Sequence, residues 1–282
     1  MVLSLHPSLL VPPTVQAFTG ALDLLTSPTV AFAVSPQRLR SAYAGSCMRL
    51  RSDGAGSPES NFGFTGAGDL DISAVTAWLT STSGSNAYGR TYYDQSGNAR
   101  DAGQSTAANQ PLFAAGSLGR GQFTFDGTND CLDTSTWSLS QGFSVWLVGY
   151  TSNRTSLSTI CGPLGAGVND RYCYCFNGQM GAYWSTSTAT GSTLFVNGSI
   201  CSALWYVNGA SSAMTFNGSL LGSSYNFGAS NIAGGIRVGL RGDNVWPWTG
   251  GIMELIIFAG DATALGGWSA FLANRKAYYS LP

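Results

Sequence analysis

Short segments of alternating or continuous apolar residues run through most of the chain, as is typical of β-strands. Phe123–Asp126 alternates, whereas Phe143–Tyr150 and Gly251–Phe258 are almost continuously apolar and predict strands buried on both faces. Ile236–Leu240 predicts a further strand. The segments on either side of Asn177-Gly178 predict a hairpin, because Asn-Gly suits a tight turn between antiparallel strands. Many short strands with regular turn signals predict an all-β sandwich or jelly roll.

Two further Asn-Gly pairs, Asn208-Gly209 and Asn217-Gly218, lie within the β-rich segment Leu204–Leu221. They predict a meander of antiparallel strands. The strand pattern continues without an internal repeat, so we expect one jelly-roll domain over residues 37–282.

Two helices are predicted beside the strands. Asp71–Thr82 begins with a residue that can cap a helix, and its apolar residues repeat at helical spacing. A short amphipathic helix is expected at about Thr263–Tyr279. The apolar faces of the two helices are formed by Val75, Trp78 and Leu79, and by Leu265, Trp268, Phe271 and Leu272.

Residues 1–36 differ from the rest of the chain because prolines interrupt their apolar stretches. Proline removes a backbone donor and disfavours central strands and regular helices. We therefore expect residues 1–36 to form an extended N-terminal arm that docks on another subunit. The alternative is a segment that wraps its own domain. The prolines are Pro7, Pro12, Pro13, Pro28 and Pro36.

Charge is scarce in this chain, and its distribution argues against several kinds of chemistry. Only 10% of the residues are charged, the net charge is −1, and the basic residues form no stripe, so we expect no nucleic-acid partner. The single histidine, His6, lies near the terminus, and neither a Ser-His-Asp triad nor a histidine-ligated zinc is expected. Asn129, Asp130 and Asp133 come nearest to a calcium site but form no dense cluster. We expect neither a metal nor a cofactor.

The chain shows no membrane span of about 20 apolar residues and no signal peptide at its start. Its six cysteines fit either disulfides or buried free thiols. Two of them, Cys173 and Cys175, would point to the same face of a strand. We expect no membrane association and a route of exposure other than a signal peptide, such as assembly into a particle that lysis releases.

Three stretches together resemble one known family: Arg38–Gly54, Thr91–Pro111 and Phe123–Ser135. They are similar to the catalytic-domain family of arabinofuranosidase B, whose stand-alone relatives also occur in bacteriophage structural proteins and bacterial surface proteins. The resemblance covers roughly residues 36–280. It implies a concanavalin-like jelly-roll β-sandwich with short peripheral helices.

The resemblance also implies where catalytic carboxylates would stand. A retaining glycosidase needs two of them, about 5–5.5 Å apart. The family's acid/base maps onto Asp243, in a Gly-Asp-Asn turn. The family's nucleophile is a glutamate after two adjacent cysteines, but no glutamate follows Cys173 and Cys175, and the chain's only glutamates are Glu59 and Glu254. We therefore expect no enzyme activity, with a retaining hydrolase that uses Asp243 as the alternative.

An aspartate from elsewhere in the chain could replace the missing nucleophile if the fold brought it opposite Asp243. Asp170 is the candidate.

One short loop, RGDNVWPW, combines flat aromatic rings with planar polar groups, as sugar-binding surfaces do. Its proline limits the ordering cost on binding. The alternatives are an Asx turn at Asp243 and tryptophans that fold back to cover the sandwich edge. The candidate residues for binding a glycan or a protein partner are Arg241, Asn244, Trp246 and Trp248.

These observations predict a non-enzymatic jelly-roll protein, virion-associated or displayed on an extracellular surface. Capsid decoration and a tail-associated role are the expected forms. Its partners would be other virion or surface proteins, bound through residues 1–36 in an oligomer or larger assembly, and a glycan at the loop.

Overall fold

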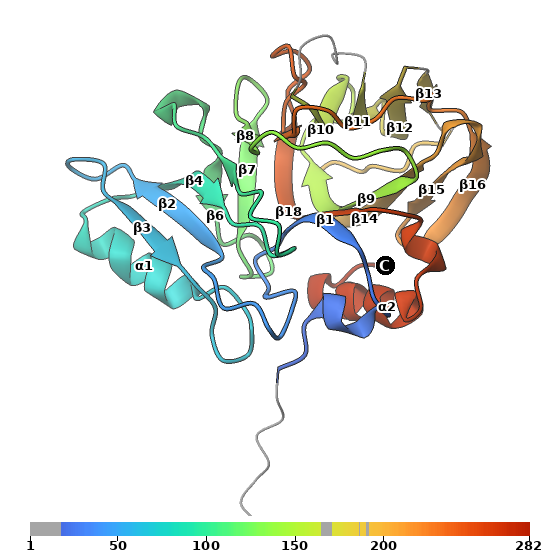
Figure 1. Cartoon of the computed structure of the whole chain (residues 1–282). Helices are drawn as coiled ribbons and strands as arrows, with labels where there is room; N and C mark the ends of the chain where they lie inside the picture. Colours follow the sequence, from blue (N-terminus) through green and yellow to red (C-terminus); the bar gives the residue numbers. More distant parts are fainter. Residues whose placement is uncertain (1–17, 165–170, 186, 190–191) are drawn as a thin grey trace, which may run out of the picture.

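The computed structural model describes residues 18–164, 171–185, 187–189 and 192–282. Its strands are antiparallel and form an all-β sandwich with short peripheral helices, which confirms the predicted jelly-roll class (Figure 1). A first sheet has the order β16–β15–β14–β9–β18–β1. The bounds of these strands are Ser219–Tyr225, Ser212–Phe216, Cys201–Val207, Phe143–Thr151, Thr249–Phe258 and Val30–Val34.

A second sheet faces the first, and a third group of strands continues from both. The second sheet has the order β13–β12–β11–β10–β17–β8–β5, with bounds Ser187–Ala189, Gln179–Trp184, Arg171–Phe176, Ser158–Pro163, Ile236–Val238, Leu132–Asp133 and Ala102–Gly103. The third group, β3–β2–β4–β6–β7, spans Glu59–Phe62, Met48–Ser52, Ala87–Tyr92, Leu112–Ala114 and Gln122–Asp126. It joins the second sheet through β4–β5 and the first through β7–β18.

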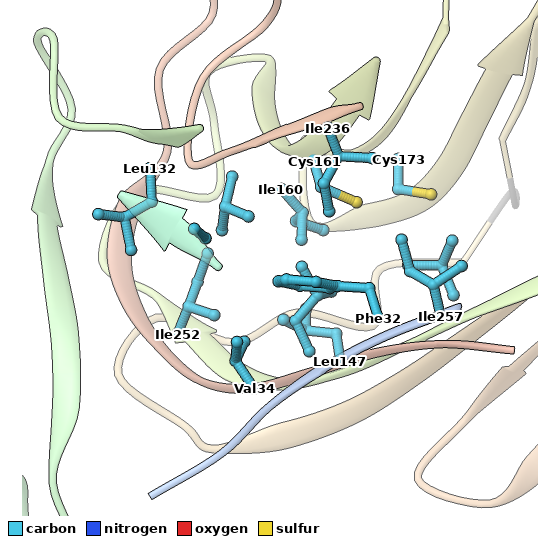
Figure 2. Close-up of a cluster of buried hydrophobic side chains, with 14 of the residues drawn as sticks. Phe32, Val34, Leu132, Leu147, Ile160, Cys161, Cys173, Ile236, Ile252 and Ile257 are labelled. Atoms are coloured by element: carbon cyan, nitrogen blue, oxygen red, sulfur yellow. The ribbon is translucent and has the colours of Figure 1, made fainter. Parts of the chain in front are cut away.

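The main core lies between the first and second sheets (Figure 2). Phe32 and Leu147 of the first sheet point toward Ile160 and Cys173 of the second. On its opposite face the first sheet is covered by the 3-10 helix η1 (Ala21–Leu24) and the helix α2 (Trp268–Tyr279). Burial on both faces explains why β9 and β18 are almost continuously apolar, as predicted.

The helix α1 (Ile72–Ser81) agrees with the prediction. Asp71 accepts a hydrogen bond from the Ala74 amide at 3.0 Å, Val75 is buried, and Trp78 packs edge-on against Phe62.

The C-terminal helix begins later than predicted. A separate 3-10 helix, η4, spans Ala262–Ala264, and α2 begins only at Trp268. The interruption falls at Gly267, whose φ of +84° lies in the left-handed region that glycine adopts at little cost. Phe271 is buried against the first sheet, as its place on the predicted apolar side implied.

Two of the three Asn-Gly turns have the predicted form. Asn177-Gly178 joins β11 to β12, and Asn217-Gly218 joins β15 to β16, with positive φ at both residues of each pair. Asn208-Gly209 differs, because Asn208 has a φ of −152° and a 3-10 helix, η3 (Gly209–Ser211), follows it. The meander is therefore present, but one of its connections is longer than predicted.

The predicted boundary after residue 36 is wrong for residues 18–36. Residues 30–34 form β1, which pairs with β18 and is completely buried. An arm separate from the domain cannot include this strand, because its side chains contribute to the core. Residues 18–36 wrap their own domain, which was the alternative, and residues 1–17 lie outside the described residues.

All six cysteines are buried and carry free thiols. Cys173 and Cys175 both face the core, as their spacing on one strand predicted. The free-thiol alternative therefore describes this structure.

Candidate functional site

The loop from Arg241 to Trp248 leads into β18, and its polar groups bind one another. The Arg241 guanidinium donates two hydrogen bonds to the Asp243 carboxylate, at 2.7 and 2.5 Å. The same guanidinium lies 3.7 Å from the centroid of the Trp246 ring. Such stacking is favourable between a cation and an indole face. Arg241 therefore holds both the carboxylate and the aromatic ring of this loop.

Trp246 is partly exposed and has a strained backbone. Its φ of +55° lies in the left-handed region, which is rare for a large side chain and also disfavoured before a proline such as Pro247. The Thr159 amide donates to the Trp246 carbonyl at 2.8 Å and helps to fix this conformation. Backbone strain of this kind often accompanies functional positions.

Trp248 is not a surface residue. It is 0% exposed and packs in the main core, with its ring 6.2 Å from that of Phe195. The prediction that Trp248 binds a ligand is therefore wrong, because no ligand could reach its ring. For this tryptophan the alternative, folding back over the sandwich, is correct.

Beneath the loop lies a set of rings that we call the aromatic cluster: Tyr172, Tyr174, Tyr183 and Trp246. The Tyr172 ring is 5.4 Å from that of Trp246 and 5.8 Å from that of Tyr183, its cross-strand partner. Burial raises the pKa of Tyr172 to about 12, so its hydroxyl is neutral at physiological pH. The alternation in RYCYCF, with tyrosines on one face and cysteines on the other, could have indicated this cluster.

Asn244 is the exposed polar residue of the loop. Its side-chain oxygen accepts a hydrogen bond from Arg237, which also pairs with Asp133 through two contacts of 2.7 Å. Asn244 thus stands beside Trp246 on a surface fixed by ion pairs. Four of the predicted loop residues, Arg241, Asp243, Asn244 and Trp246, do come together at the surface.

The glutamates do not lie opposite Asp243. Glu254 is 0% exposed and pairs with Arg275 of α2 at 2.8 Å, and it accepts a hydrogen bond from the Trp146 indole at 2.9 Å. These partners lie on the helix-covered side of the first sheet. Asp243 instead binds Arg241, whose guanidinium lies 5.6 Å from the centroid of the Tyr172 ring on β11 of the second sheet. Glu59 pairs with Arg49 at 2.8 Å on the third group of strands. Both glutamates therefore serve ion pairs of the fold.

Asp170, the predicted substitute nucleophile, lies outside the described residues.

The part of the chain that the structure describes holds no group of three His, Cys, Asp or Glu side chains placed to bind a metal. Of the three residues considered for calcium, Asp133 pairs with Arg237, and Asn129 donates to the side chain of Asn109. Asp130 accepts from the Asp126 amide at 2.9 Å. Within the same residues, no helix has the length and apolar character needed to cross a membrane.

Comparison with solved structures shows that two arabinofuranosidases share this fold. An arabinofuranosidase solved with arabinofuranosyl-α-1,2-xylobiose matches 90% of this chain with a TM-score of 0.72 and 15% identity. A GH54 α-L-arabinofuranosidase solved with a cyclic sulfate inhibitor matches 90% with a TM-score of 0.66 and 17% identity. The chain covers 65% of the length of each. At these identities the likeness establishes the fold, which is the one that the sequence resemblance implied.

Neither a protein-family profile nor a curated protein sequence matches the chain.

Proposed function

We infer that this protein is a non-hydrolytic saccharide-binding β-sandwich whose ligand stacks on Trp246. The observation that carries this function is the preorganised Trp246 ring, held by a strained backbone, by Arg241 on its face and by Tyr172 at its edge. A rigid, partly exposed indole loses little entropy on binding. The neighbouring Asn244 offers hydrogen bonds to hydroxyl groups. The carbohydrate-active fold neighbours support the same ligand class.

The absence of hydrolysis is part of the proposal. Arg241 engages both oxygens of Asp243, the residue that the resemblance assigns as acid/base. A second carboxylate is required as nucleophile. Among the described residues, neither glutamate stands beside Asp243, and loss of a nucleophile lowers the rate by orders of magnitude.

A glycan array tests this function with wild type and two variants. Trp246→Ala should weaken binding about tenfold or more, since tryptophans at the centre of a contact often dominate its energy. Leu220→Ala is the matched control, because Leu220 is 63% exposed on β16 and belongs to a different surface. Absence of binding by wild type on a broad array, or equal binding by Trp246→Ala, would refute the function.

Display on a virion or extracellular surface, within an oligomer or larger assembly, is the finer part of the proposal. It is supported by the low charge of the chain and by the sequence resemblance to the arabinofuranosidase B family, whose stand-alone relatives also occur in phage structural proteins. We propose attachment through residues 1–17 and not through the whole of residues 1–36, since Val30–Val34 forms β1 in the core.

Truncation tests attachment through these residues. Deletion of residues 1–17 should leave a folded protein that no longer joins its particle, whereas deletion of residues 1–36 removes β1 and should prevent folding. Circular dichroism and co-sedimentation with the particle separate the two effects. Full incorporation of the folded shorter deletion would disprove attachment through residues 1–17.

A further inference from the structure

A cavity of about 620 Å³, lined by charged, polar and apolar side chains, lies on the third group of strands. Its floor is a single cross-strand row. Arg51 of β2 pairs in register with Tyr88 of β4, Tyr88 with Leu112 of β6, and Leu112 with Thr124 of β7. The neighbours of Tyr88 along β4, Ala87 and Gly89, are buried, so this row occupies the opposite, outward face of the strands. The pairing register of the strands therefore places these four side chains in one row, with Tyr88 and Leu112 at the centre of the floor.

The cavity is separate from the aromatic cluster. In Figure 1, β2, β4 and β6 lie on the left of the molecule, whereas β11 and β12 lie at the upper right. The lining of the cavity includes no residue of the Arg241–Trp248 loop. A ligand here would not contact Trp246.

Two aspartates at the β7 end of the floor have incomplete hydrogen bonding. Asp130 is only 6% exposed, and one carboxylate oxygen accepts from the Asp126 amide at 2.9 Å. Asp126 is exposed, and one of its oxygens accepts from the Thr128 amide at 2.7 Å and from the Asn129 amide at 3.4 Å. Within the described residues, the other oxygen of each has no hydrogen-bond partner, and neither carboxylate forms an ion pair. The free oxygen of Asp130 is open to solvent in the cavity, since it is not one of the buried polar atoms without a partner. A ligand in the cavity could therefore bind it.

Arg51 supplies donors at the other end of the row. Its Nε–H donates to the Gln110 side chain at 2.6 Å, and its guanidinium lies 4.8 Å from the centroid of the Tyr88 ring. Gln110 in turn donates to the Gln104 carbonyl at 2.8 Å, which fixes the amide. The guanidinium is therefore oriented by an amide and a ring, and none of the described carboxylates neutralises it.

We propose that this cavity is a second saccharide-binding site. Sugar hydroxyls both donate and accept, so they can bind the free oxygens of Asp126 and Asp130 and the N–H groups of Arg51 together. The C–H face of the sugar would lie over Tyr88 and Leu112. The volume falls in the range of about 300–1,000 Å³ typical of small-ligand pockets. The proposal shares only its ligand class with the proposed function, and two sites would make the protein bivalent.

The lining favours a sugar over a cation. The described residues hold no three carboxylates grouped for a metal. A purely cationic ligand would also meet the Arg51 guanidinium in the floor, and like charges repel. The third aspartate of the lining, Asp53, already accepts hydrogen bonds from Ser85 and Asn86. A neutral polyhydroxylated ring satisfies donors and acceptors without this repulsion.

Nuclear magnetic resonance on the isotope-labelled full chain can read the two sites separately. The backbone amide of Asp126 reports the cavity because it donates to Asp130, and the indole N–H of Trp246 reports the aromatic cluster. Xylobiose, arabinotriose and cellobiose serve as saccharide probes, and 1,5-diaminopentane serves as the cationic probe. We expect at least one saccharide to shift the Asp126 amide, with unchanged affinity in Trp246→Ala.

Two variants address the cavity without altering the core. Ala108→Trp adds a ring at an exposed residue of the lining and should weaken saccharide binding at least tenfold by filling the space. Asp130→Asn keeps an acceptor for the Asp126 amide, removes the charge, and should weaken binding severalfold. Asp261→Asn is the control, since Asp261 caps η4 far from the cavity in sequence and outside its lining.

The outcomes separate this proposal from the proposed function. Shifts at Trp246 alone, or cavity shifts that survive Ala108→Trp, would overturn the second site and leave the first. Cavity shifts with the diamine and none with any saccharide would also overturn it, in favour of a cation pocket. Shifts at the Asp126 amide alone would support the cavity and overturn the proposed function. If no saccharide shifts either reporter, both are wrong.

Discussion

The Arg241–Trp248 loop and the cavity on the third group of strands gather the same kinds of side chain, but they leave their carboxylates in different states. In both, an arginine stacks on an aromatic ring. In the loop, Arg241 closes two hydrogen bonds on Asp243, two residues away. In the cavity, Arg51 binds Gln110, and Asp130 keeps one oxygen without a partner. In the loop the arginine and the aspartate satisfy each other, whereas in the cavity Arg51 binds an amide and Asp130 keeps a free oxygen that a ligand can bind.

The largest expected effect tests whether the loop is anchored by a core residue. Trp248→Ala should lower the free energy of unfolding by about 3–5 kcal/mol, because it removes a fully buried indole and leaves a cavity. Urea denaturation measures this effect. Trp246→Ala, made in the same loop at a partly exposed ring, should cost far less stability. If the two substitutions lowered the free energy of unfolding equally, Trp248 would not be the core residue that anchors the loop while Trp246 is free to bind a ligand.

The different roles of Trp246 and Trp248 could not be predicted from the sequence. The motif identified the loop, and the Asn-Gly turns identified two hairpins, because both depend on neighbouring residues. The burial of Trp248 depends on Phe195, and the place of β1 depends on its pairing with β18, far along the chain. Prolines around β1 suggested an arm, but tertiary pairing decided its conformation.

The cavity was missed for a related physical reason. Its floor is made by Arg51, Tyr88, Leu112 and Thr124, which lie on four strands and share no motif. Only the register brings them together, and shifting one strand by a single residue would turn its side chain to the core. The overall class was predictable because alternation and turns repeat many times. The cavity was not predictable, because it depends on one particular register between the strands.

A smaller effect tests the protonation state of Asp130. The substitution Asp130→Asn should stabilise the protein. Burial raises the pKa of Asp130 from 3.8 to about 6, and the nearby Asp126 carboxylate adds to the rise. The folded state therefore binds this proton more tightly than the unfolded chain does, so stability declines as the pH rises from about 4 to above 6. Asp130→Asn removes that penalty. We expect a gain of about 1–3 kcal/mol at pH 8.

At pH 3.5 the gain should largely disappear, because Asp130 is then protonated in the folded protein and mostly so in the unfolded chain. Urea denaturation of wild type and Asp130→Asn at the two pH values measures the difference. A loss of stability at pH 8 would show that the Asp130 carboxylate is satisfied by a partner, and the contrast with Asp243 would then fail.

The smallest expected effect is that of substituting Asp243, which also tests the alternative function as a hydrolase. The side chains of Arg241 and Asp243 are 15% and 26% exposed, so their ion pair is partly screened. Asp243→Asn should therefore cost only about 0.5–1 kcal/mol of unfolding free energy. It should weaken saccharide binding modestly, because Arg241 then loses the partner that orients it over Trp246.

A general acid would behave differently: wild type would hydrolyse a chromogenic arabinofuranoside, and Asp243→Asn would abolish the reaction. We expect no turnover by either protein, because the Asp243 carboxylate is held by both oxygens against a guanidinium and neither Glu59 nor Glu254 lies opposite it. Measurable hydrolysis that depends on Asp243 would make the loop a catalytic site, and the free Asp130 oxygen in the cavity would no longer distinguish the two regions.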